Sequence, residues 1–263
     1  MAKITLTSLN KMKKEGRKIA CLTAYDASFA RIIDEAEIDV TLVGDSLGMV
    51  IQGDESTLKV SMRDMIYHTR IVSDICKHTF IVSDMPFMSY ATPAQALGNA
   101  ARLVSEGGAE MVKLEGGAQF AETIKLLADH GIPVCAHLGL TPQSINKLGG
   151  YKVQGKDQDT ARQITGDALA LETAGADMLV LECVPADLAG EITARLKIPV
   201  IGIGAGVNCN GQVLVIYDLI GITPRQARFS KNFLETTASV QEAIKKYINE
   251  VRNSEFPGEE HRF

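Results

Sequence analysis

The sequence predicts an α/β fold, a (β/α)8 TIM barrel, from three observations. Short apolar runs rich in Val, Ile and Leu alternate with longer stretches of helical periodicity, as expected for parallel strands joined by crossover helices. Eight such runs fall within about 200 residues, and no linker or change in composition separates them. The chain length of 263 residues also fits one barrel of this kind. Residues 1–263 are therefore interpreted as a single domain.

The predicted strands are apolar runs of four to six residues. In chain order they are Ile19–Ala24, Val40–Gly44, Phe80–Ser83, Met111–Leu114, Val134–His137, Met178–Glu182, Val200–Ile203 and Val213–Tyr217. A weak internal repeat supports this spacing, because Gly108-Ala109-Glu110-Met111 recurs as Gly175-Ala176-Asp177-Met178. Each copy is typical of a helix end that leads into a strand.

Helix signals lie between these runs. Thr92-Pro93-Ala94-Gln95 has the pattern of a capping box with proline at the first helical position, and Gly107-Gly108 ends that helix. Thr5–Lys14 predicts an extra helix that closes the N-terminal end of the barrel. The charged tail after Phe256 is expected at the surface or between chains.

Charge and composition exclude several classes of partner. The formal charge of −5 disfavours nucleic acid and anionic membrane surfaces. No apolar run reaches the ~18–20 residues of a membrane span, and Met1–Gly16 lacks a signal-peptide core, so a cytoplasmic location is expected. The cysteines contain no C-x-x-C pair and are interpreted as reduced thiols, mostly in the core. They are Cys21, Cys76, Cys135, Cys183 and Cys209.

Ionisable residues lie at the ends of five neighbouring strands. The active site of a (β/α)8 barrel lies at the carboxyl ends of its strands, so these positions are informative. Any one of them taken alone is also compatible with a solvated loop group. Five in succession indicate one functional site. The residues are Asp45 with Ser46, Asp84, Lys113 with Glu115, His137, and Glu182.

Several carboxylates that converge on one cavity require a compensating positive charge. Oxygen ligands suit Mg2+, which is usually held by one or two protein carboxylates. Asp45 and Asp84 are the first predicted ligands, and Glu115 is the third, directly or through water. Lys113 lies two residues before Glu115, on the same side of its strand, and is predicted to pair with an anionic substrate.

His137 and Glu182 are candidates for acid–base chemistry. Glu182 has apolar strand neighbours, an environment in which a carboxylate serves as a base near neutral pH. Two simpler interpretations remain open, a hydrogen-bonded structural histidine for His137 and an ordinary salt bridge for Glu182.

Two glycine-rich stretches have alternative interpretations. Gly202–Gly206 follows the seventh strand, where many barrels bind phosphate, but its glycines also suit close backbone approach. Leu148–Gly155 follows the fifth strand and is either a lid over the site or an ordinary surface loop.

Seven segments, in order along the chain, carry a resemblance to a known family. They are Thr23–Asp26, Val43–Met49, Asp84–Met88, Val112–Gly117, His137–Ser144, Gly149–Gly155 and Leu181–Pro185. In sequence and spacing they closely resemble the ketopantoate hydroxymethyltransferase family, and the resemblance runs essentially from end to end.

The resemblance implies a (β/α)8 barrel that forms a homo-oligomer, typically a decamer, and uses Mg2+. It also implies transfer of a hydroxymethyl group from 5,10-methylenetetrahydrofolate to 3-methyl-2-oxobutanoate, which gives 2-dehydropantoate for pantothenate biosynthesis. By analogy, the metal-site acids correspond to Asp45, Asp84 and Glu115, the keto-acid contacts to Asp45, Ser46, Asp84 and Lys113, the general base to Glu182, and an active-site histidine to His137. The base would remove a proton next to the keto group, and the resulting carbanion would attack the folate methylene.

The sequence departs from the family pattern late in the chain. Asn208, Asn210 and Tyr217 fall where relatives commonly have an acidic residue and a histidine, and the loop Pro224–Arg228 also varies. These positions lie outside the predicted metal and base residues. They therefore bear on folate contacts or loop closure more than on the type of reaction.

Two other functions are compatible with such a barrel. One is an Mg2+-dependent lyase or mutase of the phosphoenolpyruvate mutase and isocitrate lyase group, which would not need folate. Those enzymes carry a catalytic cysteine in a K-x-C-G-H loop motif, and the sequence has none. The other is a noncatalytic barrel that binds a metabolite, which predicts loss of the acids, yet all of them are present.

Overall fold

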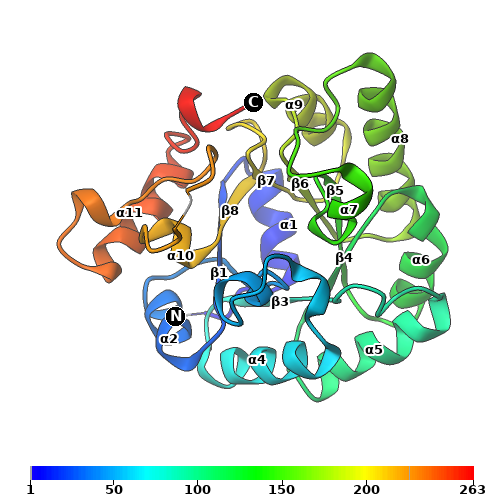
Figure 1. Ribbon diagram of the computed structural model, residues 1–263, viewed down its shortest axis with the longest axis horizontal. Coiled ribbons are helices and arrows are strands. Elements are labelled where there is room, and N and C mark those ends of the chain that lie inside the picture. The colour runs from blue at the N-terminus through cyan, green and yellow to red at the C-terminus, as the bar shows by residue number, and fades with distance from the viewer. Residues whose placement is uncertain (1, 225) are drawn as a thin grey trace.

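A closed barrel of eight parallel strands forms the centre of the protein (Figure 1). The computed structural model describes residues 2–224 and 226–263. Each strand pairs with its neighbours in sequence, and β1 pairs with β8 to close the ring. The strands are β1 (Ile19–Thr23), β2 (Val40–Val43), β3 (Phe80–Asp84), β4 (Met111–Glu115), β5 (Val134–Gly139), β6 (Met178–Glu182), β7 (Val200–Ile203) and β8 (Gly211–Leu214).

The predicted barrel is confirmed, and seven of its strands match the predicted bounds to within two residues. The eighth prediction, Val213–Tyr217, is wrong: the strand is Gly211–Leu214, and Ile216–Leu219 forms the short helix α10. Thr23 accepts a hydrogen bond from the backbone N–H of Ile216 at 3.0 Å, at the start of that helix. The apolar run spans a strand end and a helix start, which periodicity alone does not distinguish.

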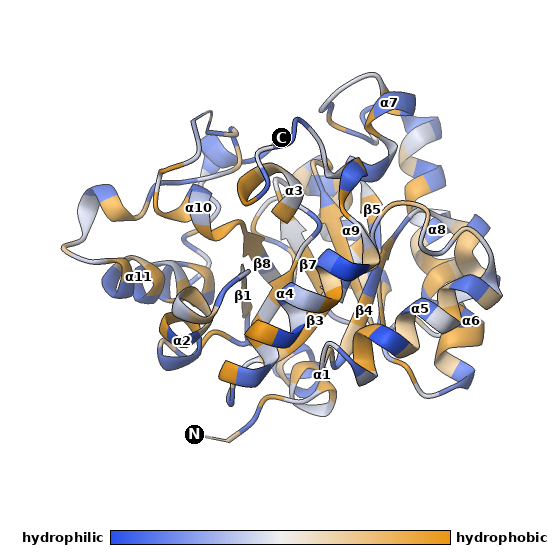
Figure 2. Cartoon of the chain, turned by 60° about the horizontal axis from the view of Figure 1, so that its bottom comes forward, coloured by the Kyte–Doolittle hydropathy of each residue, from blue (hydrophilic) through white to orange (hydrophobic). Residues whose placement is uncertain are grey.

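Helices surround the barrel, and the strands between them are mostly hydrophobic (Figures 1 and 2). The outer helices are α2 (Ala27–Glu35), α4 (Met62–Ile75), α5 (Pro93–Ser105), α6 (Ala121–Asp129), α8 (Gln158–Ala174), α9 (Ala186–Arg195) and α11 (Val240–Arg252). Two further short helices, α3 (Leu47–Val50) and α7 (Ile145–Leu148), lie in the loops that follow β2 and β5. No helix among the described residues is long and apolar enough to cross a membrane.

The capping signal of α5 is confirmed in part. Thr92 accepts a hydrogen bond from the backbone N–H of Gln95 at 3.3 Å, and Pro93 is the first helical residue. The side chain of Gln95 accepts from the backbone N–H of Ala91 rather than that of Thr92. The helix therefore begins where the sequence predicts, although the reciprocal bond of the capping box reaches one residue further back.

Helix α1 (Leu6–Lys14) closes the N-terminal end of the barrel, as the sequence predicts. Thr5 caps it by accepting a hydrogen bond from the backbone N–H of Ser8 at 3.2 Å. Leu9 and Met12 are buried in one apolar cluster with side chains from inside the barrel. These two side chains extend the core of the barrel at its N-terminal end.

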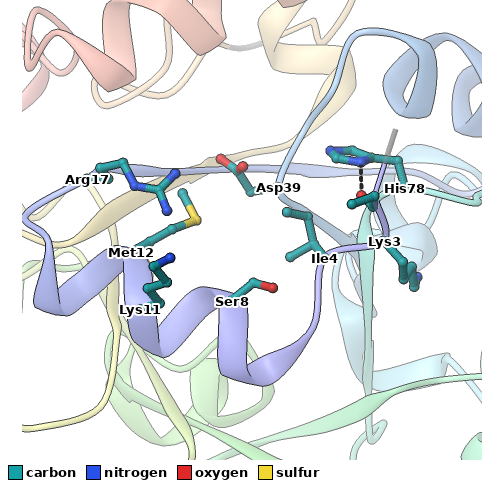
Figure 3. A pocket seen from close by; sticks show the side chains of 9 residues that line it. Lys3, Ile4, Ser8, Lys11, Met12, Arg17, Asp39 and His78 are labelled. Carbon is teal, nitrogen blue, oxygen red and sulfur yellow. Dashed lines mark hydrogen bonds between the residues drawn. The ribbon is translucent and has the colours of Figure 1, made fainter.

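A cavity of about 410 Å3 lies at this N-terminal end (Figure 3). It lies between α1 and the loops that enter the strands, and its polar lining includes Lys11, Arg17, Asp39 and His78. It is therefore at the opposite end of the barrel from the strand ends that carry the candidate site.

The segment after Phe256 folds back on the same chain. Phe256 and Pro257 are buried, whereas Glu259 and Glu260 are exposed. The carbonyl oxygen of Phe263 accepts a hydrogen bond from the backbone N–H of Ala186, the first residue of α9, at 3.0 Å. The tail is thus partly packed rather than fully exposed. All five cysteines are free and buried, as predicted.

We predict that Leu9→Ala destabilises the protein by about 2–5 kcal/mol, because it leaves a cavity beneath the barrel core at a fully buried position. Urea unfolding at fixed protein concentration measures the change. Lys14→Ala, at an exposed position of the same helix, is the matched control. Equal stability of the two variants would contradict the role of α1 as a closure of the core.

Candidate active site

The ionisable residues of the candidate site continue the inward-facing rows of the barrel. Alternate residues of a strand point to the same face. In β3, Phe80 and Val82 face the apolar interior, so Asp84 follows on the same face. The same alternation places the inward side chains of the next three strands at the barrel mouth: Lys113 and Glu115 from β4, His137 from β5 and Glu182 from β6.

The layer beneath these groups is tightly filled. The interior void below them has a volume of only about 20 Å3 and is lined by apolar side chains and Lys113. Water therefore has little room under the charged layer, and its groups must be compensated mainly by one another.

Lys113 and Asp84 form a buried ion pair. Their strands place them side by side, and Lys113 Nζ lies 2.6 Å from Asp84 Oδ1 with both side chains almost fully buried. Burial alone would lower the pKa of Lys113, but the carboxylates of Asp84, Glu115 and Asp45 raise it above its usual value. The acids around the lysine therefore favour its charged form.

Asp45 lies beside this pair, at the end of β2. Its backbone N–H donates to Asp84 Oδ2 at 3.0 Å, and its own carboxyl group is buried. Burial, followed by the charges of Asp84 and Glu115, raises the pKa of Asp45 well above its usual value. A Cβ at position 44 would lie 2.7 Å from Ser46 Oγ, so glycine there leaves room for the Ser46 hydroxyl. Ser46 is in turn hydrogen-bonded to the Tyr25 hydroxyl at 2.8 Å.

His137 lies between two carboxylates. Its Nδ1 is 3.5 Å from Glu115 Oε1, and its Nε2 is 3.3 Å from Glu182 Oε2. Burial would lower the pKa of His137, but Glu115 and Glu182 raise it to about 9. Burial would likewise raise the pKa of Glu115, yet His137 and Lys113 hold it below its usual range. The two acids on either side of the histidine therefore favour its cationic form.

Neither ring nitrogen of His137 makes an aligned hydrogen bond to any described residue. The contacts to Glu115 and Glu182 are thus ion pairs, which fit both a catalytic and a structural histidine. Glu182 is more accessible than its neighbours, with 13% of its side chain exposed. It therefore faces the open end of the site.

Sequence reasoning missed Gln143, which lies in the short helical turn Pro142–Ser144 after β5. Its side-chain amide contacts Asp45, and its backbone N–H contacts Glu115. Looking for polar residues directly after each strand does not find Gln143, because it lies four residues beyond the end of β5. The one available signal is its place in the segment His137–Ser144, which carries the family resemblance.

The two glycine-rich stretches occupy different positions. A Cβ at Gly206 would lie 2.5 Å from the Ala186 side chain, so close packing accounts for glycine there. In the loop Leu148–Gly155, the Tyr151 hydroxyl donates a hydrogen bond to the Met49 sulfur at 3.6 Å. The backbone N–H of Gln154 donates to the carbonyl oxygen of Cys183 at 2.9 Å. That loop thus contacts the segments after β2 and β6, on two sides of the mouth.

Of the variable loop Pro224–Arg228, Arg225 lies outside the described residues.

The donor set fits a divalent cation. Four carboxylates face one lysine and one histidine, which leaves two negative charges uncompensated when all six groups are ionised. Asp84 Oδ1 also makes no aligned hydrogen bond, although it faces Lys113. Across residues 2–224 and 226–263, no three His, Cys, Asp or Glu side chains form a ready-made ligand cluster. The uncompensated carboxylate charge suits Mg2+, which takes few protein ligands and completes its shell with water or substrate.

Solved structures with a similar fold are barrels of the phosphoenolpyruvate mutase type. Phosphonopyruvate hydrolase matches with a TM-score of 0.64 and 13% identity, over 97% of this chain and 99% of its own. Phosphoenolpyruvate phosphomutase from Streptomyces platensis subsp. rosaceus matches with a TM-score of 0.63 and 14% identity, over 95% and 98%. At this identity the likeness concerns the fold alone.

Much higher identity links the chain to curated enzymes. The 3-methyl-2-oxobutanoate hydroxymethyltransferase of Nitrosococcus oceani is 60% identical over 98% of both chains. The enzyme of the same name from Photorhabdus laumondii is 56% identical over the full length of both. The family model for ketopantoate hydroxymethyltransferase matches residues 3–259. The chain therefore belongs to the ketopantoate hydroxymethyltransferase family.

Proposed function

We propose that this enzyme transfers a hydroxymethyl group from 5,10-methylenetetrahydrofolate to 3-methyl-2-oxobutanoate in pantothenate biosynthesis. The observation that carries the proposal is the cluster at the barrel mouth, where a buried cationic lysine, three buried carboxylates and a more accessible glutamate meet. The names of its full-length relatives support the same reaction. The cluster is suited to binding a small anion and removing a proton from it.

Substrate binding requires positive charge and hydrogen-bond donors for a keto acid. Lys113 supplies the charge, and Ser46, placed by Tyr25, supplies a hydroxyl beside Asp45. Asp45, Asp84 and Glu115 would hold Mg2+, which supplies Lewis-acid stabilisation of the negative charge that develops on the keto oxygen.

Glu182 is the proposed base. It would take the proton from the carbon next to the carbonyl group, and His137, whose Nε2 lies 3.3 Å from Glu182 Oε2, would orient the carboxylate. The carbanion then attacks the one-carbon unit of the folate donor. The loop that contains Tyr151 would limit access of water during this step. Water then cleaves the bond between the methylene carbon and the folate nitrogen, and its hydroxide becomes the hydroxyl group of the product. Tetrahydrofolate leaves after its nitrogens have taken up the other proton of the water and the proton held by Glu182.

The family resemblance supports further proposals about the whole molecule. We propose a homo-oligomer, a decamer, located in the cytoplasm, with a keto acid and folate as small-molecule partners and no nucleic-acid or membrane partner. The net charge of −5 supports the exclusion of nucleic acid. Sedimentation of the purified protein measures the subunit number.

The reaction is tested by proton–deuterium exchange at C3 of 3-methyl-2-oxobutanoate in D2O. We expect NMR to show exchange that depends on Mg2+ and on the enzyme, followed by formation of 2-dehydropantoate when methylenetetrahydrofolate is added. Exchange without product would retain the proton-abstracting site and reject the folate donor. Absence of both would favour the lyase group or a noncatalytic barrel.

We predict that Glu182→Gln lowers the exchange rate by about 10²–10⁴-fold, because the amide cannot accept the proton. Binding of the keto acid, measured by calorimetry, should change little, since Lys113 and the acids around it are retained. Glu191→Gln, on the exposed face of α9, is the matched control. A Glu182→Gln enzyme with a normal exchange rate would remove this residue as the base.

We also predict that Asp84→Ala weakens Mg2+ and keto-acid binding by at least about tenfold. The change removes the partner of Lys113 and the acceptor of the Asp45 N–H. Calorimetric titration of the metal-free protein measures both affinities. Asp74→Ala, at an exposed position of α4, should leave them unchanged; unaltered affinities in Asp84→Ala would argue against Asp84 as a ligand.

A further inference from the structure

Gln143 occupies an unusual position for a neutral side chain. It is 5% exposed and lies in the turn after β5, against the acidic end of the barrel. Buried amides are normally retained only where every donor and acceptor is satisfied. The partners of Gln143 therefore indicate what its side chain does.

Its contacts connect the ends of β2, β3 and β4 to the loop after β5. The side-chain Nε2 donates to Asp45 Oδ2 at 2.8 Å and to the carbonyl oxygen of Met85 at 2.9 Å. Its backbone N–H donates to Glu115 Oε2 at 2.9 Å. Asp45 follows β2, Met85 follows β3 and Glu115 ends β4. A single residue thus contacts two of the three proposed metal ligands and the residue next to the third, Asp84.

The orientation of the amide is fixed by these partners. Both N–H groups of Nε2 face oxygen atoms, and the Met85 carbonyl can only accept. A flipped amide would place its own oxygen against that carbonyl and against Asp45. On the other side, Oε1 accepts a hydrogen bond from the Tyr90 hydroxyl. The amide is therefore fully satisfied in one orientation only.

Tyr90 holds the amide from behind. It is 6% exposed, and its ring packs edge-on against Phe120 at 5.2 Å between centroids. Its hydroxyl also lies 3.3 Å from the backbone nitrogen of Glu115. The packed ring fixes the hydroxyl, the hydroxyl fixes the amide, and the amide fixes the carboxylate of Asp45.

We propose that Gln143 is a positioning residue that holds the Asp45 and Glu115 carboxylates in the orientation in which they bind the divalent cation. The inference rests on the proposed function, since it assumes that these acids are metal ligands. A partner that orients a ligand contributes to metal affinity without contacting the metal, and its loss typically costs about 10–100-fold. The side chain of Gln143 would act in this way on Asp45, and its backbone N–H would do so on Glu115.

The test uses Gln143→Met, which keeps the length of the side chain and removes its donors and acceptor. We expect calorimetric titration of the metal-free, full-length protein with Mg2+ to give a Kd at least about tenfold above that of the unchanged enzyme. Tyr90→Phe keeps the packed ring and removes only the hydroxyl, so a smaller increase of about threefold is expected.

Gln212→Met is the matched control, because Gln212 is also a buried glutamine, 3% exposed, but its amide donates to the Gly206 carbonyl and not to a site carboxylate. A purely structural role would lower the melting temperature of both methionine variants and leave both Kd values unchanged. A shift in Kd confined to the Gln143 and Tyr90 variants supports positioning.

A folded Gln143→Met variant with a Kd within about twofold of the unchanged enzyme would overturn the proposal. If that variant does not fold, an unaltered Kd in Tyr90→Phe overturns it instead. Failure of the unchanged enzyme to bind Mg2+ would reject the proposed metal site and this inference with it. The two failures are therefore distinguishable.

Discussion

The buried ion pair between Lys113 and Asp84 is the interaction on which the site depends. The pair lies directly above the apolar interior, with its nitrogen and oxygen 2.6 Å apart. Without the lysine, the neighbouring acids would be too costly to bury in ionised form. With it, and with His137 between Glu115 and Glu182, the strand ends retain a negative surplus that a divalent cation can compensate. Helix α1 closes the opposite end of the barrel, so the apolar core beneath the charged side chains is packed at both ends.

Most of the fold was predictable because buried parallel strands are short continuous apolar runs, whereas the helices that cover them have an apolar period of 3.6 residues. The closing helix was also predictable, because Thr5 is a good cap and Leu9 and Met12 lie on one helical face. The error at β8 has a local cause. Between Val213 and Tyr217 the chain changes from strand to helix without a polar residue or a glycine to mark the change.

The candidate site was predictable to the extent that it lies at strand ends. Asp84, Lys113, Glu115 and Glu182 belong to the strands themselves, so alternation alone places them on the inner face. Gln143 was not predictable in this way, since its approach to Asp45 depends on the path of a loop through space. The same holds for the hydrogen bond between Tyr25 and Ser46, which joins the segments after β1 and β2.

The choice of an amide at position 143 follows from the charge of the cluster. A lysine there would neutralise Asp45 and compete with a metal ion, whereas a carboxylate would add to the repulsion among the acids. A neutral amide donates two hydrogen bonds, to Asp45 and Met85, and leaves the surplus negative charge unchanged. Orientation and charge are thereby controlled by different residues: Lys113 and His137 set the charge, while Gln143 sets the direction in which the carboxylates point.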